Sequence, residues 1–89
     1  MDKPNNRLTQ IISVEISYYP LNEEYKLPIK DFIRRMNCYE SLTVRTSTMS
    51  TQVIGEYQEV MNALTAEISK SFELPHSVFV LKIINADLR

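Results

Sequence analysis

The feature that most limits the fold of this chain is a strict alternation of side chains soon after its start. One set is apolar or aromatic and the other is mostly polar: Ile12, Val14, Ile16 and Tyr18 alternate with Ser13, Glu15, Ser17 and Tyr19. Because successive side chains of a strand point to opposite faces, this period predicts a half-buried strand. Pro20 lacks the N–H that a sheet ladder needs, so we expect the strand to end there.

Two later segments repeat their apolar residues with the period of a helix. In the first, Pro28 to Met36, the proline occupies the first turn, where its missing N–H is not needed. In the second, Glu56 to Phe72, an apolar stripe runs along one side, and Pro75 blocks its continuation. Gly55 is the single glycine, and we expect it to turn the chain from a strand into this second helix.

Three further segments have the β-branched or apolar character of strands, namely Leu42 to Ser47, Thr51 to Ile54 and Ser77 to Ile84. The first two would form a hairpin around Met49. The order strand, helix, strand, strand, helix, strand predicts a ferredoxin-like α+β sandwich, in which a four-stranded antiparallel sheet carries both helices on one face. In that topology the first and third strands are central, and the second and fourth are edges.

The length of the chain bears on its assembly. With 89 residues, 44% of them hydrophobic, the chain has room for a single domain over residues 1–89, of which we expect the polar residues 1–7 to fray. The edge strand Ser77 to Ile84 is apolar on both faces, and such a strand is unfavourable in water. We therefore expect a homodimer or a homotetramer.

Charge and cysteine content argue against several classes of protein. Ten basic residues against eleven acidic ones leave a net charge of -1 with no long block of either sign, so we expect neither nucleic acid nor a membrane as a partner. The lone Cys38 excludes an internal disulfide and a Cys-rich metal site, and His76 has no second histidine with which to share a metal. We expect a cytoplasmic protein with no metal and no cofactor.

Candidate binding residues come from two places, the tip of the expected hairpin and the polar face of the first strand. Hydroxyl groups can donate and accept hydrogen bonds, which suits a small polar heterocycle, although Ser and Thr are also ordinary turn residues. The first strand's polar face would adjoin the third strand. The candidates are Ser47, Thr48, Ser50 and Thr51 at the tip, with Glu15, Ser17 and Tyr19 on the strand.

Two of these strand residues have alternative interpretations. Glu15 is a mid-strand carboxylate that could accept hydrogen bonds from an aminopyrimidine or face a thiazolium cation, or it could pair with Arg45 or Lys82 across the sheet. Tyr19, like Tyr18 before it, could stack on a flat heterocycle or pack in a core or interface. No set of neighbours is placed to activate a serine, so no catalytic residue is predicted.

Two segments resemble the YkoF-like thiamine/hydroxymethylpyrimidine-binding family of small ferredoxin-like proteins. Val14 to Leu21 is similar to the family's first strand, which ends in a proline, and Met49 to Met61 is similar to its signature Met-Gly-Thr-x-x-Glu-Gly-(acidic)-x-x-(acidic)-Val-Met. The chain departs from that signature at Ser50, where the family has glycine, and at Ile54, where glutamate is common. The matching positions are Met49, Thr51, Gly55, Glu56, Glu59, Val60 and Met61.

The resemblance implies a non-enzymatic, oligomeric protein that binds thiamine or a thiamine precursor such as hydroxymethylpyrimidine and serves as a carrier or a sensor. The family assembles as dimers and tetramers, which favours a tetramer here. The alternative is a family member that has lost vitamin binding and acts as an assembly partner or binds another small metabolite. A pocket lined by Glu15 and the tip hydroxyls would favour the first interpretation, and a site filled by Ile54 would favour the second.

Overall fold

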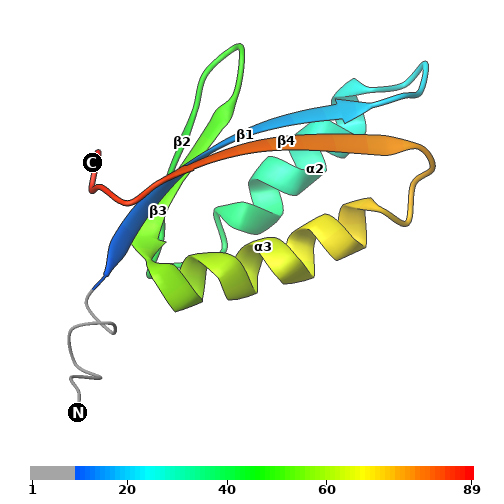
Figure 1. Ribbon diagram of the computed structural model, residues 1–89. Helices are drawn as coiled ribbons and strands as arrows, with labels where there is room; N and C mark the ends of the chain where they lie inside the picture. Colours follow the sequence, from blue (N-terminus) through cyan, green and yellow to red (C-terminus); the bar gives the residue numbers. More distant parts are fainter. Residues whose placement is uncertain (1–9) are drawn as a thin grey trace.

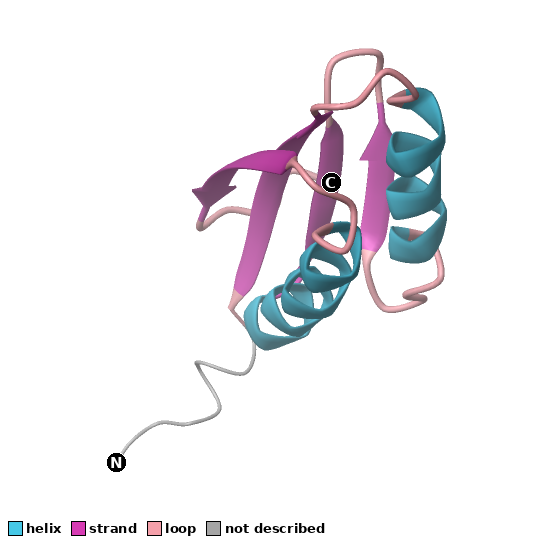
Figure 2. Cartoon of the chain, turned by 90° about the vertical axis from the view of Figure 1, so that its right-hand side faces the viewer, coloured by secondary structure: helices cyan, strands magenta, loops and turns pink. Residues whose placement is uncertain are grey.

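The computed structural model describes residues 10–89, and its elements follow the predicted order (Figure 1). The elements are β1 (Ile11–Pro20), α2 (Lys26–Met36), β2 (Thr43–Thr46), β3 (Thr51–Glu56), α3 (Tyr57–Ser71) and β4 (Ser77–Ile84). The strands form one antiparallel sheet in the order β2-β3-β1-β4, and both helices cover the same face of it (Figure 2). The prediction of a ferredoxin-like α+β fold with β2 and β4 as edges is confirmed. The prediction for residues 1–7 lies outside the described residues.

The core lies between the sheet and the two helices. On β1 the alternating residues Ile12, Val14 and Ile16 are all at most 2% exposed, as the period predicted. They pack with apolar side chains of both helices, because each helix turns its stripe toward the sheet. The helical members of this core are Phe32 and Met36 on α2 and Val60, Ala63 and Leu64 on α3.

Gly55 does not turn the chain, so that expectation is wrong. It lies inside β3 opposite Ile12, and its φ is not positive. A Cβ at this position would come within 2.7 Å of Leu42 Cδ2, so the glycine makes room for the leucine. The helix begins two residues later, where the Glu56 side chain caps α3 by accepting a hydrogen bond of 3.1 Å from the Glu59 amide.

A polar cluster ties α2 to α3 at the edge of the core. Arg35 donates to the Glu67 carboxylate at 2.6 Å, to the Ser71 hydroxyl at 2.8 Å and to Asp31 at 2.9 Å. Tyr39 donates to the other oxygen of Glu67 at 2.6 Å. Burial would raise the pKa of Glu67, but the hydrogen bonds from Tyr39 and Arg35 outweigh it and lower the pKa. The cluster therefore holds the two helices together through an ionised carboxylate.

The last residues of the chain lie over the sheet face that the helices leave open. The Ser13 hydroxyl donates to the Ala86 carbonyl at 2.6 Å and accepts from the Leu88 amide at 3.0 Å, while Arg45 donates to the Leu88 carbonyl at 3.1 Å. Ile54 pairs with Ser13 in the register of β1 and β3, so it shares this face, and it is 0% exposed. We call residues 85–89 the C-terminal strap, because they close one part of the open face.

Candidate functional site

A cavity of about 480 Å³ opens on the helix side of the sheet, between α2, the end of β1 and the hairpin that joins β2 to β3. Its size falls within the range of about 300–1,000 Å³ that is typical of small-molecule sites. Three parts of the chain that are distant in sequence form its wall. They are residues 16–21 of β1 and the loop after it, Tyr25 with Ile29, Phe32 and Ile33 of α2, and the hairpin residues 46–51.

All four predicted tip residues line this cavity, but the hydroxyls of two of them already have partners. Ser47 Oγ accepts from the Met49 and Ser50 amides, each at 3.3 Å, so Ser47 is a turn residue of the ordinary kind. Ser50 Oγ donates to Glu15 Oε2 at 2.9 Å. Among the described residues, neither Thr48 nor Thr51 uses its hydroxyl in a hydrogen bond.

Thr51 is the most informative of the four residues. It pairs with Ile16 on the helix-facing side of the sheet and is 6% exposed, so its hydroxyl is shielded from bulk solvent. A buried hydroxyl without a partner is unfavourable by about 1–3 kcal/mol, and buried polar groups in folded proteins are nearly always bonded. A ligand that gives Thr51 its partner would therefore gain affinity at this point.

Three tyrosines contribute to the cavity in different ways. Tyr18 is part of the wall, because its ring stacks on Phe79 with centroids 4.2 Å apart and meets Phe32 edge to face at 5.8 Å. Tyr19 and Tyr25 are 52% and 50% exposed, which leaves ring surface for a flat ligand at the mouth. Sequence reasoning missed Tyr25, since a single aromatic residue in a charged loop carries no periodic signal.

The structure places Glu15 and Ser17 outside this cavity. Both lie on the open face of the sheet, where Ser17 is opposite Val80, and Glu15 Oε1 is 3.5 Å from Lys82 Nζ. The alternative interpretation of Glu15, an ion pair with Lys82, is thus present. Glu15 lines a separate groove of about 470 Å³ on the open face, beside the C-terminal strap. The lining of the cavity includes Tyr19 and the four tip residues, although Tyr19 alternates onto the same strand face as Glu15 and Ser17. Glu15 contacts the tip through Ser50.

Another hollow, of about 530 Å³, lies beside α2 and α3, and four of the charged residues in its lining are paired with one another. Arg35 bonds Asp31, and Lys70 is 3.4 Å from Glu73, so the hollow offers a ligand few unpaired groups. Hydrogen bonds from Arg34 and Arg35 lower the pKa of Asp31. This hollow suits a ligand less well than the cavity at the hairpin.

The part of the chain that the structure describes contains no cluster of side chains that could bind a metal ion. No three His, Cys, Asp or Glu side chains of residues 10–89 are grouped to hold an ion. Cys38 is exposed just after α2, where its thiol donates to the Arg34 carbonyl at 3.5 Å, and His76 lies in the loop before β4. Within the same residues, neither helix is long and apolar enough to cross a membrane.

Comparison with known proteins identifies the fold. No protein-family model and no curated protein matches the chain. Among solved structures, a candidate thiamine biosynthesis/salvage protein from Thermotoga maritima is similar over 89% of this chain and 84% of its own, with a TM-score of 0.75 and 20% identity. A hypothetical protein from Methanocaldococcus jannascii is similar over 90% of this chain and 84% of its own, with a TM-score of 0.76 and 24% identity. A protein from Streptococcus pneumoniae is similar over 88% and 89%, with a TM-score of 0.80 and 18% identity.

At these sequence identities the structural similarity establishes a shared fold, and function depends on the residues of the site.

Proposed function

We propose that this chain is a binding protein for thiamine or a thiamine precursor such as hydroxymethylpyrimidine, and that it acts as a carrier or sensor in the cytoplasm. The observation that carries the proposal is the cavity of about 480 Å³, with the buried hydroxyl of Thr51 in its wall and two half-exposed tyrosines at its mouth. A planar ring with a polar substituent fits both features. The resemblance of Met49 to Met61 to the thiamine-binding signature and the fold shared with the Thermotoga protein support the same ligand class.

The proposed function is binding without catalysis. General acid–base chemistry needs a group whose pKa lies near the working pH, most often an imidazole, carboxylate or amine. The side chains that line the cavity are aliphatic, aromatic, hydroxyl or phenol groups and one thioether. Such a lining can hold and orient a ring, and it offers no group of the usual kind for moving a proton.

Calorimetric titration of the full chain with hydroxymethylpyrimidine and with thiamine tests the proposal. Thr51→Val should weaken binding by about tenfold, which is the order expected when a ligand group loses a buried partner. Thr65→Val is the matched control, because Thr65 is exposed on α3 and bonds only the Met61 carbonyl at 2.8 Å. If neither titration released or absorbed heat of binding, the proposal would be contradicted.

One observation favours the alternative, in which the chain has lost the vitamin and serves in assembly. Ile54, which stands where the resembled family commonly has glutamate, is fully buried on the open face beside the C-terminal strap. A carboxylate is thus replaced by an aliphatic side chain. Ile54 does not line the cavity at the hairpin, however, and therefore leaves that cavity free. A chain that self-associates and binds neither compound would support this alternative.

Self-association is part of the proposal under either alternative. On the open face of β4, Val78, Val80 and Ile84 are 41–50% exposed. Burying each such side chain against a second copy of the chain would contribute roughly 1.5–3 kcal/mol at full burial, and a two-fold axis makes the patch its own complement. Light scattering should report a dimer or a tetramer at micromolar concentration, and Val80→Asp should shift it toward monomer. A wild-type chain that is folded and monomeric would contradict this part.

A further inference from the structure

The cavity at the hairpin has no charged side chain in its lining. Its polar groups are hydroxyls and phenols, and the rest of the wall is aliphatic or aromatic apart from the Met49 thioether. A charge that enters a site of this kind loses water and finds no counter-charge, which disfavours the charged form of a ligand strongly. The lining therefore has a preference for uncharged ligands that follows from its composition.

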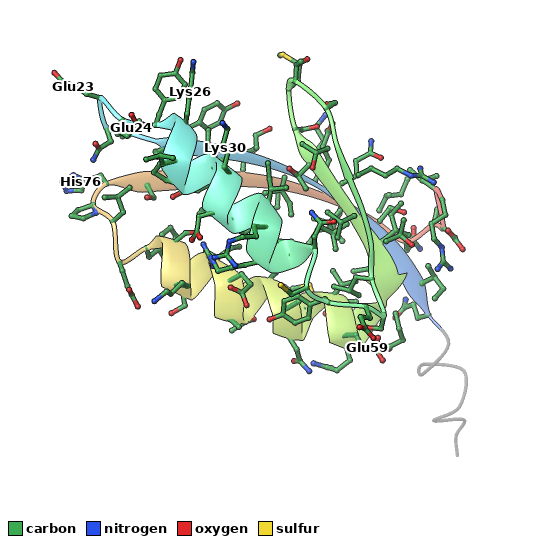
Figure 3. The ribbon with its side chains drawn as sticks, turned by 180° about the vertical axis from the view of Figure 1, so that it is seen from behind. Glu23, Glu24, Lys26, Lys30, Glu59 and His76 are labelled. Atoms are coloured by element: carbon green, nitrogen blue, oxygen red, sulfur yellow. The ribbon has the colours of Figure 1, made fainter. Side chains whose placement is uncertain are left out.

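Two lysines lie on α2, the helix that forms one side of the cavity. Lys26 and Lys30 project from α2, the helix whose neighbouring residues Tyr25 and Ile29 line the cavity (Figure 3). Within residues 10–89 neither lysine has an ion-pair partner. The positive end of the α2 dipole lies at the same end of the helix.

None of the nearby carboxylates lines the cavity. Glu24 accepts a hydrogen bond of 3.2 Å from the Leu27 amide and so caps the first turn of α2. Glu23 points away at the far tip of the loop (Figure 3). Glu15, the candidate to face a thiazolium ring, starts from the other face of the sheet, where Lys82 is 3.5 Å from one of its oxygens and Ser50 donates to the other at 2.9 Å.

We propose that this cavity selects an uncharged planar heterocycle with a hydrogen-bonding substituent, of which free hydroxymethylpyrimidine is an example, over a cationic ligand such as thiamine. The inference rests on the proposed function and narrows its ligand class. Thiamine carries a permanent positive charge on its thiazolium ring, whereas the aminopyrimidine alone is neutral at mildly alkaline pH. Thr51 gives the neutral ring a hydrogen-bonding partner in the wall of the cavity.

Attraction between a cation and the tyrosine rings does not reverse this preference. One face of Tyr18 is covered by Phe79, whose ring lies 4.2 Å away and nearly parallel. Tyr19 and Tyr25 are half exposed, and cation–π attraction is weakest where water competes for the cation. The rings therefore provide stacking area for a flat ligand, and a positive charge on that ligand adds little to the attraction.

The test is a pair of calorimetric titrations of the full chain at mildly alkaline pH, one with hydroxymethylpyrimidine and one with thiamine. The neutral compound is expected to bind at least about tenfold more tightly. Thiamine binding as tightly or more tightly would overturn this inference and leave the proposed function in place. Binding of neither compound would overturn the proposed function itself, so the two failures are distinguishable.

A designed carboxylate tests whether charge is the cause. Thr46 is exposed and lines the cavity from the edge strand β2, so Thr46→Glu places a negative charge at the wall with little disturbance of the core. Thr46→Gln has nearly the same size without the charge and is the matched control. Compared with Thr46→Gln, Thr46→Glu should improve the affinity for thiamine relative to that for hydroxymethylpyrimidine by about tenfold. An equal ratio in both variants would overturn the inference.

Discussion

The two faces of this sheet differ in nearly every physical respect, although the same strands form both. The helix side is apolar, closed by α2 and α3, and contains a cavity with an uncharged lining. The open side has the Glu15–Lys82 ion pair, the C-terminal strap and the exposed valines of β4. Because the strand period is two, moving one residue along β1 exchanges one environment for the other. Ligand binding and self-association can therefore be assigned to opposite faces and tested separately.

The largest expected effect comes from opening the core on the helix side. Phe32 is 1% exposed and meets Tyr18 and Phe79, so Phe32→Ala should lower the free energy of unfolding by about 3–5 kcal/mol. Ile54→Ala on the open side should cost about 2 kcal/mol, at the low end for such a change, because a short strap can settle into the space that is left. Urea unfolding measures both variants. If Ile54→Ala lost as much unfolding free energy as Phe32→Ala, or more, the open side would not be the more adaptable of the two.

The next effect depends on pH and belongs to the cluster between the helices. The pKa of Glu67 is lowered in the folded state. Its contribution to the free energy of unfolding is therefore present above the unfolded-state pKa of about 4.3 and is lost as the pH falls through the folded-state pKa. Glu67→Gln should therefore lose about 1.5–3 kcal/mol at neutral pH. The gap between the two proteins should close below about pH 4, as the wild-type carboxylate is protonated.

Urea unfolding across this pH range checks the expectation. Glu73→Gln is the control, since Glu73 is an exposed partner of Lys70, and it should change stability by less than about 1 kcal/mol. A gap between wild type and Glu67→Gln that stays constant as the pH falls would contradict the role of the charged carboxylate.

Much of this fold was predictable because its signals are local. The alternation on β1 and the apolar stripes of the helices are periods of two and of about 3.6 residues, and they set the order of elements. Gly55 was misinterpreted because the reason for it is a contact with Leu42, which is distant in sequence. A clash of that kind has no sequence pattern.

The site was predictable only in part, for two physical reasons. The tip hydroxyls were found from composition, but which of them are already bonded depends on the fold, as the Ser50 to Glu15 contact illustrates. Ser13 was expected only to belong to the strand's polar face, and its bonds to Ala86 and Leu88 form because the end of the chain returns to β1. Tyr25 enters the cavity through the start of α2, which no periodicity indicates.

On the open side, the strap should be released by a single substitution. Ser13→Ala removes the hydroxyl that bonds both Ala86 and Leu88, and it should lower the free energy of unfolding by about 1–2 kcal/mol. Hydrogen exchange at the Leu88 amide should become faster at the same time. Ser17→Ala is the control, four residues along the same face of β1, and it should alter neither quantity. If the Leu88 amide exchanges at the same rate in Ser13→Ala, Ser13 does not hold the strap.

The smallest effect is expected from the surface ion pair. Lys82 is 82% exposed at its side chain, so Lys82→Ala should change the free energy of unfolding by only about 0–1 kcal/mol. Ligand affinity should also stay the same, because Lys82 lies on the face opposite the cavity. A several-fold change in affinity for hydroxymethylpyrimidine would place the ligand on the open face.

Amide chemical shifts of the isotope-labelled full chain, followed during titration with hydroxymethylpyrimidine, locate the ligand on one face of the sheet or the other. Shift changes are expected to concentrate at Tyr25, Ile29 and the hairpin residues 46–51, which share the cavity wall. Little change is expected at Glu15, Lys82 and Leu88, which line the groove on the open face. Changes that concentrate at those three residues, or none at saturating ligand, would rule out binding in the cavity at the hairpin.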